Sequence, residues 1–164
     1  KEQRLSVKVP AGINHGQRLK LRGEGEDAPK GGVAGDLYVE IGLKAHKVFK
    51  RKDCDIVCEL SLSYSQAVLG GEVEVPTLAG ATTVKVPPGT QSGKIFRLRG
   101  KGIVDLQTGK LGDQHVVAFV HIPSPKNDRH RQLLEELATI EGKPKPGSSN
   151  ESRTFLEKVK EFFD

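Results

Sequence analysis

Apolar and polar residues alternate in several short segments of the chain, and this alternation predicts β-strands. Apolar side chains occupy every second position in residues 5–9 (LSVKV), 18–22 (RLKLR) and 36–43 (DLYVEIGL). A period of two places them on one face of a strand that is buried on one side only. Pro10 lacks a backbone N–H and should end the first strand. No helical pattern separates these segments, which favours antiparallel β-sandwich units over a parallel α/β sheet.

The same pattern occurs twice, at an offset of 77 residues. Residues 7–26 (VKVPAGINHGQRLKLRGEGE) match residues 84–103 (VKVPPGTQSGKIFRLRGKGI), and Gly35-Asp36 matches Gly112-Asp113 with no insertion between. The matched glycines should lie in tight turns, where they permit a positive φ. The second copy has its own set of predicted core residues: Val84, Val86, Leu98, Val116, Val120 and Ile122. We therefore expect two related supersecondary units.

The glycine-rich turns do not match phosphate-binding loops. Gly89 and Gly93 have one residue too few between them for a P-loop, and no Ser or Thr follows the next lysine. Gly23 and Gly25 are not followed by a third glycine at the dinucleotide-binding spacing. We find no nucleophile or paired-carboxylate signature, so the sequence predicts no enzyme.

The composition fits many short strands joined by turns, because only 5% of the 164 residues are aromatic and 19 are glycine. The length allows two small domains plus a further segment. No apolar run approaches the roughly 18 residues of a membrane span and no signal-like segment is present, so we expect a cytoplasmic protein with no membrane contact. The chain contains no methionine. We therefore interpret it as part of a longer polypeptide.

The net charge of +5 comes from the predicted β-rich part of the chain, since residues 127–164 carry one more acidic than basic residue. Its densest basic run consists of Lys44, Lys47, Lys50, Arg51 and Lys52. We interpret this run as a solvated linker; the alternative is a surface that attracts an acidic partner. Phe49 is the one aromatic residue interleaved with it, so nucleic-acid binding is not expected.

Two cysteines, Cys54 and Cys58, lie four residues apart in a β-type segment, where both should face the same side. We interpret them as structural thiols of a reducing compartment. The histidines are scattered: His15, His46, His115, His121 and His130. A zinc site needs about four ligands at closer spacing, so we expect no metal and no other cofactor in this chain.

The last forty residues change to a helical pattern. Asn127 or Asp128 can cap a helix over residues 129–140, and Gly142 should end it. Residues 143–150 have linker composition, and residues 151–164 predict a second short helix. Its apolar residues are Phe155, Leu156, Val159, Phe162 and Phe163.

An isolated helix this short is marginal in water, and each buried phenylalanine contributes roughly 1.5–3 kcal/mol, so this tail should dock. It docks either on its own domain or on a second copy of the chain, and a two-fold homodimer is the preferred interpretation. Leu133 and Leu137 of the preceding helix are assigned to the same dimer contact.

Several segments, in order, carry a resemblance to a known family. These are the first repeat, GDLYVEIGLKAHKVFKR, ALGGEVEVPTLAG, the second repeat and FLEKVKEFFD. This order resembles the C-terminal part of bacterial DnaJ-type J-domain co-chaperones over nearly the whole chain. The resemblance implies two tandem β-sandwich peptide-binding domains, a helical dimerisation segment, and a role in holding client proteins beside a DnaK-type chaperone.

Two family features are absent from this sequence. The His-Pro-Asp signature of the J-domain is missing, since His46 is followed by Lys47-Val48, and the Cys-x-x-Cys-x-Gly-x-Gly zinc repeats are missing too. The family's zinc is therefore expected only in that cysteine-rich region. The resemblance implies that residues 1–47 form the second half of the first β-domain, residues 48–125 the second β-domain, and residues 126–164 the dimerisation segment.

Comparison of the two repeats suggests an apolar surface on the first. At the offset of 77, Leu5, Leu37 and Ile41 match the smaller or more polar Thr82, Gln114 and Ala118. The excess predicts a pocket for a large apolar side chain of an extended peptide. By resemblance, Leu5 and Val39 match the family's client groove, with Val7, Leu37 and Ile41 as neighbours. The alternative is that these residues fill the core of the first domain.

Two functions follow from these observations. The preferred hypothesis is a non-enzymatic co-chaperone segment that binds unfolded client polypeptides, prevents their aggregation and delivers them to a DnaK-type chaperone, with dimerisation adding avidity. The alternative is a dimerising structural or assembly module that does not itself bind clients.

Overall fold

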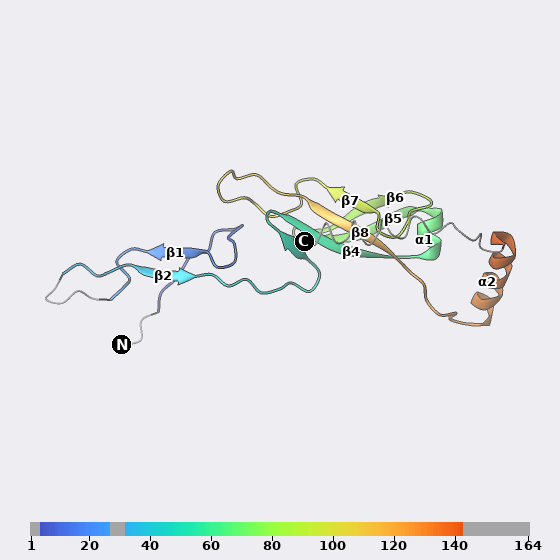
Figure 1. Ribbon diagram of the computed structural model, residues 1–164, viewed down its shortest axis with the longest axis horizontal. Helices are drawn as coiled ribbons and strands as arrows, with labels where there is room; N and C mark the ends of the chain where they lie inside the picture. Colours follow the sequence, from blue (N-terminus) through green and yellow to red (C-terminus); the bar gives the residue numbers. More distant parts are fainter. Residues whose placement is uncertain (1–3, 27–31, 143–164) are drawn as a thin grey trace. The chain divides into compact units, whose positions relative to one another are not determined.

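The computed structural model describes residues 4–26 and 32–142 of the chain, and these are mainly β (Figure 1). The strands are β1 (Arg18–Leu21), β2 (Leu37–Glu40), β3 (Lys50–Lys52), β4 (Asp55–Ser63), β5 (Gly71–Thr77), β6 (Gly80–Val86), β7 (Ile95–Leu98) and β8 (Gln114–His121), and the helices are α1 (Tyr64–Leu69) and α2 (Asp128–Glu141). The sheets have the strand orders β1-β2, β3-β4-β8-β7 and β5-β6. Pairing is antiparallel between β1 and β2, β3 and β4, and β5 and β6. The predicted mainly β fold with a C-terminal helix is confirmed.

Internal contacts divide the chain into two compact units. The first comprises Lys1–Cys58 with Arg97–His115, and the second comprises Glu59–Phe96 with Val116–Asp164. The domain boundaries predicted from the sequence, after residues 47 and 125, stay predictions.

The two repeats make the same backbone hydrogen bonds at the same offset. Each bond runs from a glycine N–H to a carbonyl, and the matched pairs are Gly16 to Ile41 (2.8 Å) with Gly93 to Ala118 (2.7 Å), and Gly25 to Gly35 (2.8 Å) with Gly102 to Gly112 (2.9 Å). Gly23 and Gly100 both have a positive φ, 73° and 65°, which an L side chain rarely adopts. The turn chemistry of the predicted repeat is therefore confirmed.

The strand predicted at residues 5–9 is wrong, because no strand is described there. The matching segment of the second repeat lies in β6, which pairs with β5. A strand needs a neighbour to satisfy its backbone groups, and no described strand pairs with residues 5–9. The strand predicted over residues 36–43 is confirmed in part, as the shorter β2.

The core is built mostly from β4, β5, β6 and β8. In the first unit the buried apolar residues are Ile13, Ile56, Val57 and Cys58, and in the second they are Leu60, Leu62, Ala67, Val75, Val84, Val86, Val116, Val117 and Ala118. The predicted core positions Val84, Val86 and Val116 are confirmed, and Leu98 and Val120 are half-buried. Ile122 was predicted in the core but is 82% exposed, because β8 ends at His121 and leaves it beyond the sheet.

The predicted helix at residues 129–140 is confirmed as α2. The Oδ1 atom of Asn127 accepts a hydrogen bond from the N–H of His130 at 2.8 Å, and Gly142 is the C-cap. The second predicted helix, at residues 151–164, lies outside the described residues. None of the helices in the described ranges is long and apolar enough to cross a membrane.

Helix α1 was not predicted. It begins with a capping box, in which Ser63 Oγ accepts from the N–H of Gln66 at 3.2 Å and Gln66 Oε1 accepts from the N–H of Ser63 at 3.0 Å. These reciprocal bonds satisfy backbone N–H groups that have no acceptor within the first turn of a helix. A six-residue helix is too short to show a hydrophobic period, so the cap was its only sequence signal.

The two cysteines do not face the same side of one strand, as the sequence predicted. Cys54 is half-exposed in the turn before β4, and Cys58 is buried within β4. The difference arises because β4 begins only at Asp55. Cys58 Sγ accepts a hydrogen bond from the side-chain amide of the buried Gln114 at 3.2 Å.

Candidate functional site

The β1–β2 hairpin carries the most coherent part of the predicted groove. Its register places Leu19 opposite Val39 and Leu21 opposite Leu37. Residues directly opposite each other in an antiparallel pair share a face, and so do residues two apart along a strand. These four side chains therefore form one apolar face, which is half-buried. We call these four residues the hairpin face.

The opposite face of the hairpin is polar and satisfied by its own ion pairs. Lys20 Nζ lies 2.7 Å from Asp36 Oδ2 and 5.7 Å from the centre of the Tyr38 ring, and Arg18 Nε lies 3.4 Å from Glu40 Oε2. The contact with Asp36 raises the pKa of Lys20, and Lys20 together with the N–H of Gly23 lowers the pKa of Asp36. The charged side chains of this face are thus paired with one another, whereas the hairpin face carries only aliphatic side chains.

The predicted groove residues are brought together only in part. Leu37 and Val39 belong to the hairpin face, and Ile41 follows β2, half-buried, with its N–H bonded to the carbonyl of Gln17 at 2.9 Å. Val7 is half-buried and Leu5 is 38% exposed, and both precede the hairpin in irregular structure. The structure thus groups three of the five positions around β2.

Sequence reasoning missed two members of this surface, Leu19 and Leu21. Their alternation with Arg18 and Lys20 was visible in the sequence and predicted β1. Only the register of β1 against β2 reveals that they share a face with Val39 and Leu37. Periodicity gives the face of a strand but not its partner.

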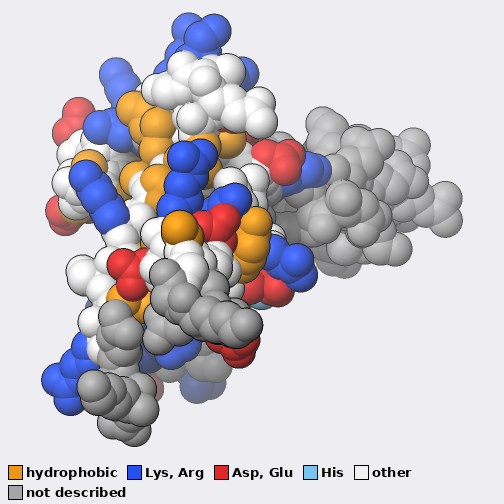
Figure 2. Space-filling view, turned by 90° about the vertical axis from the view of Figure 1, so that its left-hand side faces the viewer, with side chains coloured by type: hydrophobic (Ala, Val, Ile, Leu, Met, Phe, Trp, Pro, Cys, Tyr) orange, Lys and Arg blue, Asp and Glu red, His pale blue; other side chains and the backbone are white. Residues whose placement is uncertain are grey.

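Figure 2 shows the molecule from the left-hand side of Figure 1, where hydrophobic side chains are exposed among Lys and Arg side chains. The exposed apolar residues of the first unit include Leu5, Val9, Val33, Tyr38, Leu43 and Val48. Exposed apolar surface beside basic residues can hold an apolar segment and tolerate acidic residues next to it.

The matching positions of the second repeat behave differently. At the offset of 77, the five predicted groove residues correspond to Thr82, Val84, Gln114, Val116 and Ala118. Four of these are buried, with exposures between 0% and 6%, and Thr82 is half-buried. The same positions therefore serve as core in one repeat and lie at least partly open in the other.

The residues assigned to dimerisation are described only in part. On α2, Leu133 is 46% exposed and Leu137 is half-buried, and the helix has no buried residue. Its apolar side is thus uncovered in the described part of the chain. The remaining assigned residues, Phe155, Leu156, Val159, Phe162 and Phe163, lie outside the described residues.

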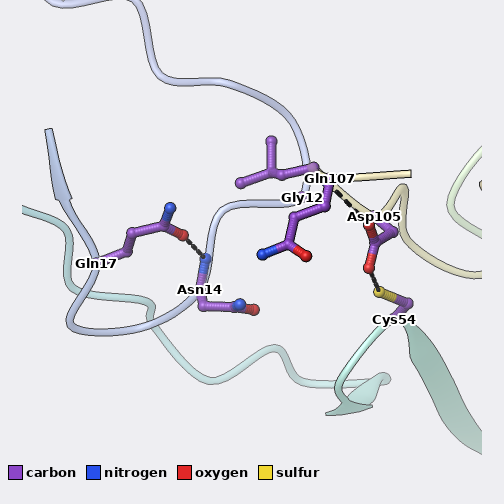
Figure 3. Close-up of a pocket in the computed structure, with 7 residues that line it drawn as sticks. Gly12, Asn14, Gln17, Cys54, Asp105 and Gln107 are labelled. Carbon is purple, nitrogen blue, oxygen red and sulfur yellow. Dashed lines mark hydrogen bonds between the residues drawn. The ribbon is translucent and has the colours of Figure 1, made fainter. Parts of the chain in front are cut away.

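A polar cavity of about 210 Å³ also lies in the first unit. It is lined by Gly12, Asn14, Gln17, Cys54, Asp105, Leu106 and Gln107 (Figure 3). Cys54 Sγ lies 3.6 Å from Asp105 Oδ2, and burial together with this carboxylate raises the pKa of the thiol. A thiol kept protonated is a poor nucleophile. Within residues 4–26 and 32–142, no group of three or more His, Cys, Asp or Glu residues is placed to hold a metal ion.

Comparisons with known proteins agree on one family. The model of the DnaJ C-terminal domain matches residues 1–123. The chain is 46% identical over 166 residues to the chaperone protein DnaJ of Vesicomyosocius okutanii, and 48% identical over 162 residues to that of Paraburkholderia phymatum. These alignments cover 100% and 98% of the chain but 44% and 42% of the relatives. The chain therefore spans less than half the length of the relatives it matches.

Proposed function

Because the chain belongs to the DnaJ C-terminal domain family, we propose that it is the client-holding part of a DnaJ-type co-chaperone. In this function it binds hydrophobic segments of unfolded or misfolded proteins, prevents their aggregation and delivers them to a DnaK-type chaperone in the cytoplasm. It acts as a homodimer, so that two weak contacts with one client reinforce each other.

The observation that carries this proposal is the half-buried apolar hairpin face. Each Leu or Val side chain that a client covers contributes up to about 1.5–3 kcal/mol, so a few such contacts suffice for reversible holding. Among the described residues, β1 and β2 pair only with each other, so each keeps one strand edge with unpaired backbone groups. An extended client segment can add to such an edge and place alternate side chains on the hairpin face.

The test compares client binding by serine variants. Leu5→Ser and Val39→Ser remove apolar surface at the two positions that resemble the family groove, and each should weaken binding of an unfolded model client about tenfold. Val33→Ser is the matched control, because Val33 is 92% exposed and lies outside the predicted groove. Sedimentation equilibrium with and without client measures both binding and mass. Unchanged client binding by the groove variants, with the dimer intact, would contradict the proposal.

The second candidate function is an assembly module that dimerises without binding clients. It is favoured by the burial of Val84, Gln114, Val116 and Ala118, which suggests that the matching first-repeat residues also serve as core when further strands cover them. In that case Leu5→Ser and Val39→Ser lower the thermal stability of the first unit and leave client binding unchanged.

A further inference from the structure

Arg51 belongs to the basic run of the sequence, but its guanidinium is engaged inside the first unit. Nη1 donates to the carbonyl of Ile13 at 2.7 Å, and Nη2 donates to the carbonyl of Gly12 at 2.9 Å and to Oδ1 of Asn14 at 2.6 Å. Nε donates to the carbonyl of Asp53 at 2.7 Å. Four acceptors fix the planar fork of an arginine in a way that a lysine cannot reproduce.

The turn that accepts hydrogen bonds from Arg51 packs into the first unit through one buried side chain. Ile13 is 5% exposed, whereas every other described residue between positions 4 and 50 is half-buried or exposed. One buried apolar residue in an otherwise open segment acts as an anchor, since its burial is worth about 1.5–3 kcal/mol. The carbonyls on either side of it would lose water on burial, and Arg51 supplies the donors that replace it.

The same turn also approaches the second repeat closely. A Cβ built on Gly12 would lie 2.0 Å from the carbonyl oxygen of Val104, and Gly12 has a φ of +91°. Val104 forms an isolated bridge with Leu111, so its backbone is held in place. Only a glycine allows this approach of one backbone to another.

The matching turn of the second repeat is held by different partners. The N–H of Gly89 donates to the carbonyl of Val68 at 3.1 Å, and that of Thr90 donates to the carbonyl of Ala67 at 2.9 Å. A Cβ on Gly89 would meet nothing within 4 Å. The turn of the second repeat thus donates backbone N–H groups to carbonyls of α1. The turn of the first repeat instead accepts hydrogen bonds from Arg51 at its own carbonyls.

From these contacts we infer that Arg51, Ile13 and Gly12 form an intramolecular latch, which fastens the turn of the first repeat to β3 and to Val104. Arg51 is its positioning residue. The turn leads through Gln17 directly into β1, so the latch holds the base of the β1–β2 hairpin. It also occupies the guanidinium of Arg51.

The latch is tested by hydrogen exchange of the 164-residue chain, a readout that does not depend on client binding. Arg51→Lys keeps the charge but loses the four-acceptor geometry. We expect the amides of residues 12–21 to exchange about tenfold or more faster, because several charge-assisted hydrogen bonds are lost, while residues 71–86 of the β5–β6 hairpin keep their rates. Lys47→Ala is the control, since Lys47 is an exposed member of the same run. Equal exchange of residues 12–21 in both variants would overturn the inference.

A pair of glycine variants tests the contact with Val104 separately. Gly12→Ala and Gly89→Ala both place an L side chain at positive φ, but only the first meets a backbone carbonyl. Gly12→Ala should therefore accelerate exchange of residues 12–21 by a larger factor than Gly89→Ala accelerates exchange of residues 87–96. An equal or smaller factor for Gly12→Ala refutes the close contact.

Discussion

The carboxylate of Asp113 accepts a hydrogen bond from the backbone N–H of Gly100 at 2.8 Å. In the first repeat, Asp36 accepts from the N–H of Gly23 at 3.2 Å. Each carboxylate also forms an ion pair with the third residue of the preceding strand. In β7 this residue is Arg97, 2.5 Å from Asp113, and in β1 it is Lys20, 2.7 Å from Asp36. The Gly–Asp closure is therefore a duplicated device that ties the end of one strand to the start of the next.

Replacing these carboxylates should destabilise the two repeats unequally. Asp113→Asn should lower the Tm more than Asp36→Asn, because the side chain of Asp113 is 13% exposed and that of Asp36 is 33% exposed. An amide can still accept from the glycine N–H but no longer attracts the cation. Thermal unfolding of both single variants and the double variant provides the comparison. A larger effect of Asp36→Asn would show that exposure does not govern the closure.

The two aspartates also predict how the stability of the folded chain decreases at acid pH. Hydrogen bonding from Gly100 and Arg97 lowers the pKa of Asp113, and Lys20 with Gly23 lowers that of Asp36. A carboxyl whose pKa is lower in the folded chain stabilises the fold above its ordinary pKa of about 4, and that contribution disappears as the pH falls through the lowered value. The urea concentration at the unfolding midpoint of the parent chain should therefore decrease as the pH is lowered from about 5 to about 2.

The double Asn variant isolates these two carboxyls. Its urea midpoint should be lower than that of the parent near neutral pH, and it should fall less steeply on acidification. If parent and variant lose stability in parallel below about pH 4, other acidic residues dominate the acid limb.

A second repeat-matched pair concerns the glycine before each closing aspartate. A Cβ at Gly112 would lie 2.1 Å from the carbonyl oxygen of Cys54, whereas a Cβ at Gly35 would lie 3.7 Å from the nearest atom, the carbonyl oxygen of Glu26. Gly112→Ala should cost about 1–3 kcal/mol or more, because backbone must move, and Gly35→Ala should change the stability by less than about 0.5 kcal/mol. Urea unfolding measures both. Equal costs would mean that the Cys54 turn is not closely packed on the second repeat.

The dimer prediction is tested by truncation. Ending the chain before Asn150 removes all five assigned residues of the tail and should convert a dimer into a monomer in sedimentation equilibrium, because the apolar side of α2 alone offers little area. Ile122→Ser is a control for loss of exposed apolar surface elsewhere, since Ile122 is 82% exposed. A truncated chain that keeps its dimer mass would move the interface away from the tail.

The sequence predicted the features that depend on local chemistry. The repeat was visible because glycine and proline are needed where the turns bend, and α2 was visible because Asn127, Gly142 and the spaced leucines mark its ends and its apolar side. Irregularity at residues 5–9 could not be foreseen, because a strand depends on a partner that periodicity does not name.

The candidate site was predictable to the same degree. Alternation placed Leu37 and Val39 on one face, but Leu19 and Leu21 joined them only through the register of the hairpin. The role of Arg51 was hidden as well, since a basic residue in a basic run gives no sign that backbone carbonyls far away in the chain will surround it.

The paired glycines at Gly25–Gly35 and Gly102–Gly112 close each long loop at its base, at 2.8 Å and 2.9 Å. The segments inside, VDLQTGKL in the second repeat and DAPKGGVA in the first, differ almost completely. The loop sequences are thus the part of each unit in which the two copies have diverged, whereas the glycine pair that closes the loop at its base is the same in both.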